Sequence, residues 1–183
     1  IVELMSFQFD KRAQWHVRSV FAEKQNVVLI GMPGCGKSTV GKLLAEKLNK
    51  PFIDADKEIA LTAGKPIPQI FAESGESVFR SVETDVLKRL GKQSGYVIAT
   101  GGGCITRPEN YASLHCNGTI IWIQRSLNAL PTDGRPLSQA NKLEEMYQVR
   151  KPLYEAFADY AVSNNSSVED TVNAVLAYIR LEV

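Results

Sequence analysis

A short apolar run followed at once by a glycine-rich segment limits the possible folds of this chain more than any other feature. Residues 27–30 are Val-Val-Leu-Ile, and the letters GMPGCGKS at 31–38 fit the pattern G-x-x-x-x-G-K-[ST]. A helix-like stretch over 37–48 follows. Between a strand and a helix this pattern predicts a phosphate-binding loop, because glycines let successive backbone N–H groups turn toward phosphate oxygens. The helix also directs its positive dipole end at the same place.

The side chains at the end of the loop indicate a nucleoside triphosphate and a metal ion. Lys37 has the reach to contact the β- and γ-phosphates, and the Ser38 hydroxyl suits Mg²⁺. A glycine-rich turn that only caps a helix is the alternative, but such a turn needs neither side chain. We expect the nucleotide to contact a continuous run of residues, namely Gly34, Cys35, Gly36, Lys37, Ser38 and Thr39.

Composition limits the size of the fold and the class of partner. The chain has 183 residues, 44% of them hydrophobic, which suits one compact domain, and we expect it to be monomeric. The 21 basic and 20 acidic residues leave a net charge of +1, so we expect neither nucleic-acid nor membrane binding. No apolar stretch is long enough to cross a bilayer. Three cysteines without metal-type pairing predict reduced thiols in the cytoplasm.

Short apolar runs alternate with segments of helical period throughout residues 27–183. This alternation predicts one α/β domain on a mainly parallel sheet. We expect strands at 27–31, 52–54, 96–99, 118–123 and 160–163. Residues 1–26 form an N-terminal extension that is too apolar for a solvated tail. Two interpretations of it stay open: a helix that packs on the domain, or the remnant of a linker from an upstream domain.

Two carboxylates follow the second expected strand. Asp54 and Asp56 are two residues apart, so on an extended chain both side chains point to one side. The carboxyl ends of strands border the ligand crevice of an open α/β sheet, so both should face the phosphate loop. One could support Mg²⁺ through water while the other accepts a proton from an attacking hydroxyl. Alternatively, Asp56 simply N-caps a short helix over 57–61.

Glycine and arginine residues mark further candidate positions. A glycine triplet at 101–103 follows the third strand, and it suits a place where a ligand presses against backbone N–H groups. Arg80 and Arg150 lie beside or within apolar helical stripes, where a guanidinium needs an anion: a ligand carboxylate or an internal Asp or Glu. Arg135 lies in the turn-rich loop 131–136, from which it could meet a transferring phosphoryl group, although ordinary surface charge is the alternative.

In their order along the chain, these motifs resemble those of the shikimate kinase family. The similarity extends from residue 27 to about residue 179. It rests on the phosphate loop at 31–39, the Asp-x-Asp segment at 52–56, the segment from Ile70 to Glu83, the glycine triplet, Arg135-Pro-Leu137, and the run from Arg150 to Ala158. Six ordered motifs are far more specific than any one of them.

The resemblance implies ATP-dependent phosphorylation of the 3-hydroxyl of shikimate, in chorismate and aromatic amino-acid biosynthesis, with Mg²⁺ as the cofactor. It implies a three-layer P-loop NTPase fold like that of nucleoside monophosphate kinases, with a five-stranded parallel sheet in the order 2-3-1-4-5. Fusion to another enzyme of the same pathway occurs in the family, so an upstream domain before residue 1 is a further hypothesis.

The resemblance also implies a role for each site residue. Lys37, Asp56 and Arg135 are expected to be catalytic: Lys37 holds the phosphates, Asp56 binds and activates the hydroxyl, and Arg135 closes over the phosphates from a lid at about 131–141. Ser38 is expected to ligate Mg²⁺, which Asp54 supports through water.

The substrate contacts follow in the same way. Arg80 and Arg150 are expected to clamp the shikimate carboxylate, and the backbone of Gly102 and Gly103 to contact the ring hydroxyls. The chain departs from the family in having no adenine-side arginine at 127–131 or 164–167. We therefore expect apolar packing and backbone contacts to hold the adenine.

Other functions remain as alternatives on the sequence alone. Another small-molecule kinase of this architecture, such as a gluconate kinase, would also use arginines to hold a carboxylate. A nucleotide-dependent binding module without transfer activity is a second alternative, but it has no need for an acid that faces a hydroxyl. An ATPase that acts on DNA or RNA would need a basic face, which the charge balance does not provide.

Overall fold

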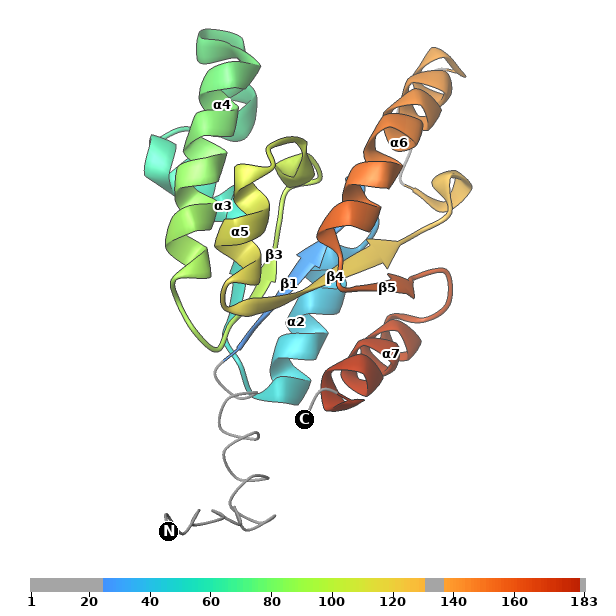
Figure 1. Ribbon diagram of the computed structural model, residues 1–183. Helices are drawn as coiled ribbons and strands as arrows, with labels where there is room; N and C mark the ends of the chain where they lie inside the picture. The colour runs from blue at the N-terminus through green and yellow to red at the C-terminus, as the bar shows by residue number, and fades with distance from the viewer. Residues whose placement is uncertain (1–24, 131–136, 182–183) are drawn as a thin grey trace, which may run out of the picture.

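The computed structural model describes residues 25–130 and 137–181. Its described part contains one sheet of five parallel strands in the order β2-β3-β1-β4-β5, with helices on both faces (Figure 1). The strands are β1 Asn26–Ile30, β2 Phe52–Asp54, β3 Val97–Ala99, β4 Gly118–Gln124 and β5 Tyr160–Ser163. The predicted sheet order is confirmed, and each strand end lies within one residue of the expected position.

The helices surround this sheet and extend above one of its edges. They are α2 Lys37–Leu48, α3 Ala55–Ala63, α4 Ile67–Gly91, α5 Glu109–His115, α6 Leu137–Phe157 and α7 Val168–Leu181, with short 3₁₀ turns η1 Cys104–Thr106 and η2 Leu127–Ala129. The bounds of α2 agree with the prediction. In Figure 1, α4 and α6 both rise past the carboxyl ends of the strands, one on each side. None of the described helices combines the length and apolarity needed to cross a bilayer.

The three central strands are continuous apolar runs because helices cover both faces of the sheet. β1 is buried at every position, β3 likewise, and β4 at most of its positions. The register places Leu29 of β1 and Asp54 of β2 on either side of Ala99 in β3. The segments that follow β1, β2, β3 and β4 therefore begin at one edge of the sheet.

Two local predictions are wrong, and both concern the residues after β2. The helix expected at 57–61 is longer, because α3 begins at Ala55. Its N-cap is Asp54, whose carboxylate accepts a hydrogen bond from the Asp56 N–H at 3.1 Å. Asp56 is therefore not the cap, and it lies in the first helical turn rather than on extended chain.

Several predictions fall outside the described residues. They concern the N-terminal extension as far as residue 24, and the lid loop at 131–136 with Arg135. The lid was expected to continue to about residue 141, whereas α6 already begins at Leu137. The three cysteines, Cys35, Cys104 and Cys116, are free thiols.

Candidate functional site

The loop between β1 and α2 adopts backbone conformations that favour glycine. Gly34 and Gly36 have φ angles of 78° and 99°, in the left-handed region. Gly36 is the N-cap of α2, so the loop delivers its backbone N–H groups to the positive end of that helix. The glycines are therefore needed here for their positive φ angles, and not only because side chains would keep a phosphate away from the backbone.

Lys37 is held inside this loop by the loop's own carbonyl groups. Its side chain is buried, and Nζ donates to the carbonyl oxygens of Gly31 at 2.8 Å and Met32 at 2.9 Å. These bonds hold the ammonium next to the N-terminus of α2. An arriving phosphate could take over the same donors without a large movement of the side chain.

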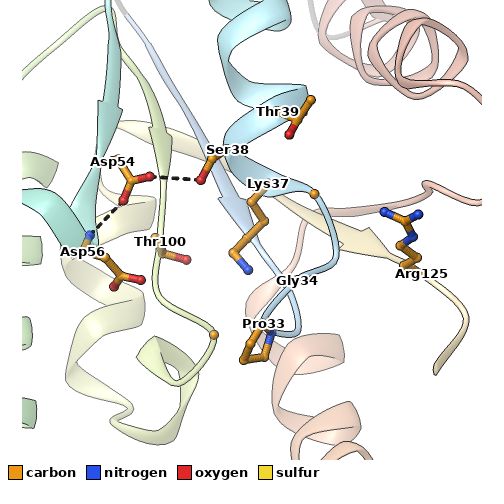
Figure 2. Close-up of a pocket in the computed structure, with 11 residues that line it drawn as sticks. Pro33, Gly34, Lys37, Ser38, Thr39, Asp54, Asp56, Thr100 and Arg125 are labelled. Atoms are coloured by element: carbon orange, nitrogen blue, oxygen red, sulfur yellow. Dashed lines mark hydrogen bonds between the residues drawn. The ribbon is translucent and has the colours of Figure 1, made fainter. Parts of the chain in front are cut away.

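A cavity of about 520 Å³ opens beside the loop (Figure 2). Residues at or after the ends of β1, β2, β3 and β4 line it, as expected because these strands end at the same edge of the sheet. The lining consists of Pro33, Gly34, Gly36, Lys37, Ser38, Thr39, Asp54, Asp56, Thr100, Gly102 and Arg125. Of the loop residues predicted to contact a nucleotide, all but Cys35 line this cavity, and the side chain of Cys35 is fully buried.

Ser38 and Asp54 provide adjacent oxygen ligands in this cavity. The Ser38 hydroxyl donates to Asp54 Oδ2 at 2.9 Å, and the other oxygen of Asp54 caps α3. A hydroxyl and a carboxylate suit Mg²⁺, which takes few protein ligands and completes its shell with water and phosphate oxygens. Among the described residues no group of three or more His, Cys, Asp or Glu side chains could hold a metal. A cation here would therefore depend on oxygens from a bound ligand.

Asp56 lies at the border between this cavity and a second one of about 260 Å³. Burial, and then the neighbouring charge of Asp54, raise the pKa of Asp56, while Lys37 and Arg80 oppose that shift. A carboxylate with a raised pKa is a better proton acceptor than an ordinary aspartate, provided that it is ionised. Its location gives it access to ligands in both cavities.

The second cavity contains the two predicted arginines. Its lining consists of Pro33, Asp56, Ile67, Phe71, Phe79, Arg80, Glu83, Gly101, Gly102, Gly103, Met146 and Arg150. Pro33, Asp56 and Gly102 line both cavities. The two spaces therefore adjoin, and the structure brings together every described residue predicted to bind the acid or its hydroxyl.

Arg80 and Arg150 differ in their partners. Arg80 donates from Nη1 to Glu83 at 2.6 Å and from Nη2 to Glu76 at 3.1 Å. The internal ion pair considered for Arg80 is therefore present. Arg150 donates to the Gly102 carbonyl at 3.4 Å, and the described part of the chain places no carboxylate within ion-pair distance of it. Arg150 is thus the freer of the two to bind an external anion.

The glycine triplet makes room for the protein's own side chains. A Cβ at Gly102 would lie 2.6 Å from Pro33 Cδ, and one at Gly101 would lie 2.7 Å from Asp56 Oδ1. A Cβ at Gly103 would collide with the Arg80 guanidinium. The triplet was expected to admit a ligand to the backbone, which stays a prediction, and the lack of side chains here also leaves room for Pro33, Asp56 and Arg80. Tyr154 fixes the segment further, because its hydroxyl donates to the Gly102 carbonyl at 2.5 Å.

Arg125, which lines the first cavity, and Asn164, which contacts the phosphate loop, are among the residues that were not predicted from the sequence. Arg125 follows β4 directly, as Asp54 ends β2, so a charged residue after a buried strand was a usable signal. Asn164 lies far from the loop in sequence, yet its Nδ2 donates to the Cys35 carbonyl at 2.8 Å and its Oδ1 accepts from Thr171 at 2.8 Å. Asn164 therefore ties the phosphate-loop backbone to α7, a contact that no local pattern reveals.

Comparisons with known proteins agree on one family. The family model described as shikimate kinase matches residues 33–180. Shikimate kinase from Burkholderia thailandensis is 38% identical over 166 residues, which cover 85% of this chain and 90% of that protein. The structure of shikimate kinase from Acinetobacter baumannii in complex with shikimate has a TM-score of 0.80 at 34% identity, over 90% of this chain and 97% of that one.

A more distant structure shares the fold alone. The gluconokinase from Sinorhizobium meliloti has a TM-score of 0.58 at 19% identity, over 87% of this chain and 94% of that one. Its similarity gives no support to gluconate as a ligand of this chain.

Removing the side chain of Asn164 should weaken nucleotide binding without unfolding the protein. The Asn164→Ala variant loses a buried hydrogen bond to the loop, worth about 1–2 kcal/mol, so we expect the dissociation constant for ATP to rise about 5- to 30-fold. Calorimetric titration measures this constant, with Asn173→Ala, an exposed asparagine of α7, as the matched control. Wild-type affinity in Asn164→Ala would show that the loop keeps its shape without this tie.

Proposed function

The chain belongs to the shikimate kinase family, and we propose that it transfers the γ-phosphoryl group of ATP to the 3-hydroxyl of shikimate, in chorismate and aromatic amino-acid biosynthesis. One observation carries the proposal. The cavity of the phosphate loop and the cavity of the two arginines adjoin, and Asp56 borders both. A triphosphate in the first and a small hydroxy acid in the second would meet at this carboxylate.

ATP would bind with its β- and γ-phosphates in the loop formed by residues 31–38. The loop N–H groups, the N-terminus of α2 and Lys37 supply positive charge there without further ordering, because all three are already fixed. Ser38 and Asp54 would hold Mg²⁺, Asp54 through water, and the bound ion would neutralise charge on the β- and γ-phosphates.

Shikimate would bind in the second cavity through its carboxylate. Arg150 has no carboxylate partner among the described residues and can form a bidentate pair with the ligand. Arg80 would add a second contact while Glu83 keeps its guanidinium in place. The backbone of Gly102 and Gly103 would contact the ring hydroxyls, next to Asp56.

Transfer would proceed by in-line attack of the 3-hydroxyl oxygen on the γ-phosphorus. Asp56 accepts the hydroxyl proton as the new O–P bond forms, and the bond between the γ-phosphorus and the bridging oxygen breaks to release ADP. Lys37 would offset the charge on the transferring group. We assign the same task to Arg135, which lies outside the described residues. Most of the rate enhancement in this scheme comes from positioning and charge stabilisation.

The remaining assignments belong to the same proposal. The domain would act as a monomer, with residues 1–26 as an extension or as a linker to another enzyme of the pathway. A cytoplasmic location remains a prediction from the cysteine composition.

ADP release tests the acceptor directly. With Mg²⁺ and ATP, we expect ADP release to depend on shikimate and to stay at background with gluconate or nucleoside monophosphates. Gluconate-dependent release would instead identify the chain as a gluconate kinase. Nucleotide binding without any acceptor-dependent release would instead support a binding module.

Asp56→Ala should lower turnover by about 10²-fold or more, the usual scale of general acid–base contributions, because Asp56 is the described carboxylate that lines both cavities. ATP binding should persist, since the loop is untouched. Steady-state kinetics and nucleotide titration measure the two effects. Asp85→Ala, on the exposed face of α4, is the control, and undiminished turnover in Asp56→Ala would remove this carboxylate from the mechanism.

Arg150→Ala should weaken shikimate binding by about 1.5–3 kcal/mol, the range for a hydrogen bond to a charged group. Calorimetric titration with shikimate gives the dissociation constant. Lys151→Ala removes a neighbouring exposed cation of α6 and should have little effect. If Arg150→Ala binds shikimate as tightly as the wild type, the carboxylate does not bind at this arginine.

A further inference from the structure

Arg125 is the one charged residue of the first cavity to which the scheme above gives no task. It follows β4 and lies on the side of the phosphate loop opposite Asp54 and Asp56, with Lys37 between the two sides (Figure 2). A ligand that fills the cavity from end to end must therefore pass from the two acids, across the loop, to this arginine.

The guanidinium of Arg125 lacks a protein partner in the described part of the chain. Its Nε is buried and has no hydrogen-bond acceptor there, and no described carboxylate lies within ion-pair distance. Arg80, Arg89 and Arg107 all have such carboxylates. Because no described acceptor or carboxylate holds this guanidinium, its planar face is available for a ligand to lie against.

The backbone on both sides of Arg125 is fixed. The Asn164 N–H donates to the carbonyl of Gln124 at 2.7 Å, and the Ser126 N–H donates to Asn165 Oδ1 at 2.8 Å. The segment after β5 therefore holds the residue before Arg125 and the residue after it. A side chain on an immobilised backbone loses less entropy when it binds a ligand.

The direction of the bound nucleotide decides which part of it reaches Arg125. The γ-phosphate must face Asp56, where the second cavity begins, and the loop surrounds the phosphates that follow. The nucleoside then extends from the other end of the loop, toward Arg125. We propose that Arg125 stacks the plane of its guanidinium on the nucleobase, an inference that rests on the nucleotide site of the proposed function.

Stacking of this kind contributes affinity for a nucleotide but little selectivity between bases. A guanidinium attracts the face of any aromatic ring, whereas discrimination between bases needs hydrogen bonds to their edges. Arg125 thus changes the expectation that apolar packing and backbone contacts alone hold the adenine.

The test compares ligands with and without a base. We expect Arg125→Ala to weaken binding of ATP and ADP about 5- to 30-fold, the range for a cation–π contact that becomes desolvated. GTP should lose affinity by a similar factor. Inorganic tripolyphosphate, which has no base, should bind wild type and variant equally. Titrations of the whole chain in Mg²⁺ measure all four constants, and the unfolding midpoint without nucleotide checks that the variant folds.

Two further variants make the result decisive. Arg125→Lys keeps the charge but loses the planar guanidinium, so it should restore at most part of the lost affinity. Arg89→Ala removes an exposed arginine paired with Glu58 and should bind every ligand as the wild type does. Equal losses for tripolyphosphate and ATP, or full rescue by lysine, would assign Arg125 to the phosphates and overturn the proposal. Unchanged ATP affinity in Arg125→Ala would overturn it as well.

The outcome is separate from that of the proposed function. A wild-type chain that binds ATP yet does not phosphorylate shikimate would refute the acceptor, while these titrations would still report whether Arg125 contacts the base.

Discussion

The parallel register of β1, β2 and β3 is the constraint on which the site depends. Leu29 and Asp54 flank Ala99 across three strands, so the phosphate loop, the two acids and the glycine triplet all begin at one level of the sheet. Thr100 reinforces that level, because its hydroxyl donates to the Leu29 carbonyl at 3.0 Å. A slip of one residue in any of these pairings would turn the side chains to the opposite face and separate the groups.

The charges of the site are held in place before any ligand binds. Loop carbonyls hold Lys37, Ser38 holds one oxygen of Asp54, and Glu83 holds Arg80. Preorganised charges of this kind need no rearrangement as charge develops on a transferring phosphoryl group. The groups with spare capacity are Arg125 in the first cavity and Arg150 in the second. This distribution matches a reaction in which each cavity holds one ligand and the two ligands meet at Asp56.

Features with a local cause were predictable from the sequence, and features that depend on distant residues were not. The bounds of α2 followed from the strand, the glycines and the apolar period, all of which are adjacent in sequence. The cap of α3 was not predictable, because Asp54 and Asp56 are equally good capping residues by type, and only the backbone decides between them. The Asn164 tie to the loop was not predictable, since it joins residues from opposite ends of the domain.

The location of the 3-hydroxyl relative to Asp56 tests the central claim most directly. A crystal structure with shikimate and a non-hydrolysable ATP analogue bound together would measure it. The account predicts the 3-hydroxyl oxygen within hydrogen-bond distance of the Asp56 carboxylate, about 2.6–3.2 Å, in line with the γ-phosphate in the loop. A ternary complex in which the hydroxyl lies away from Asp56, with both cavities filled, would contradict it.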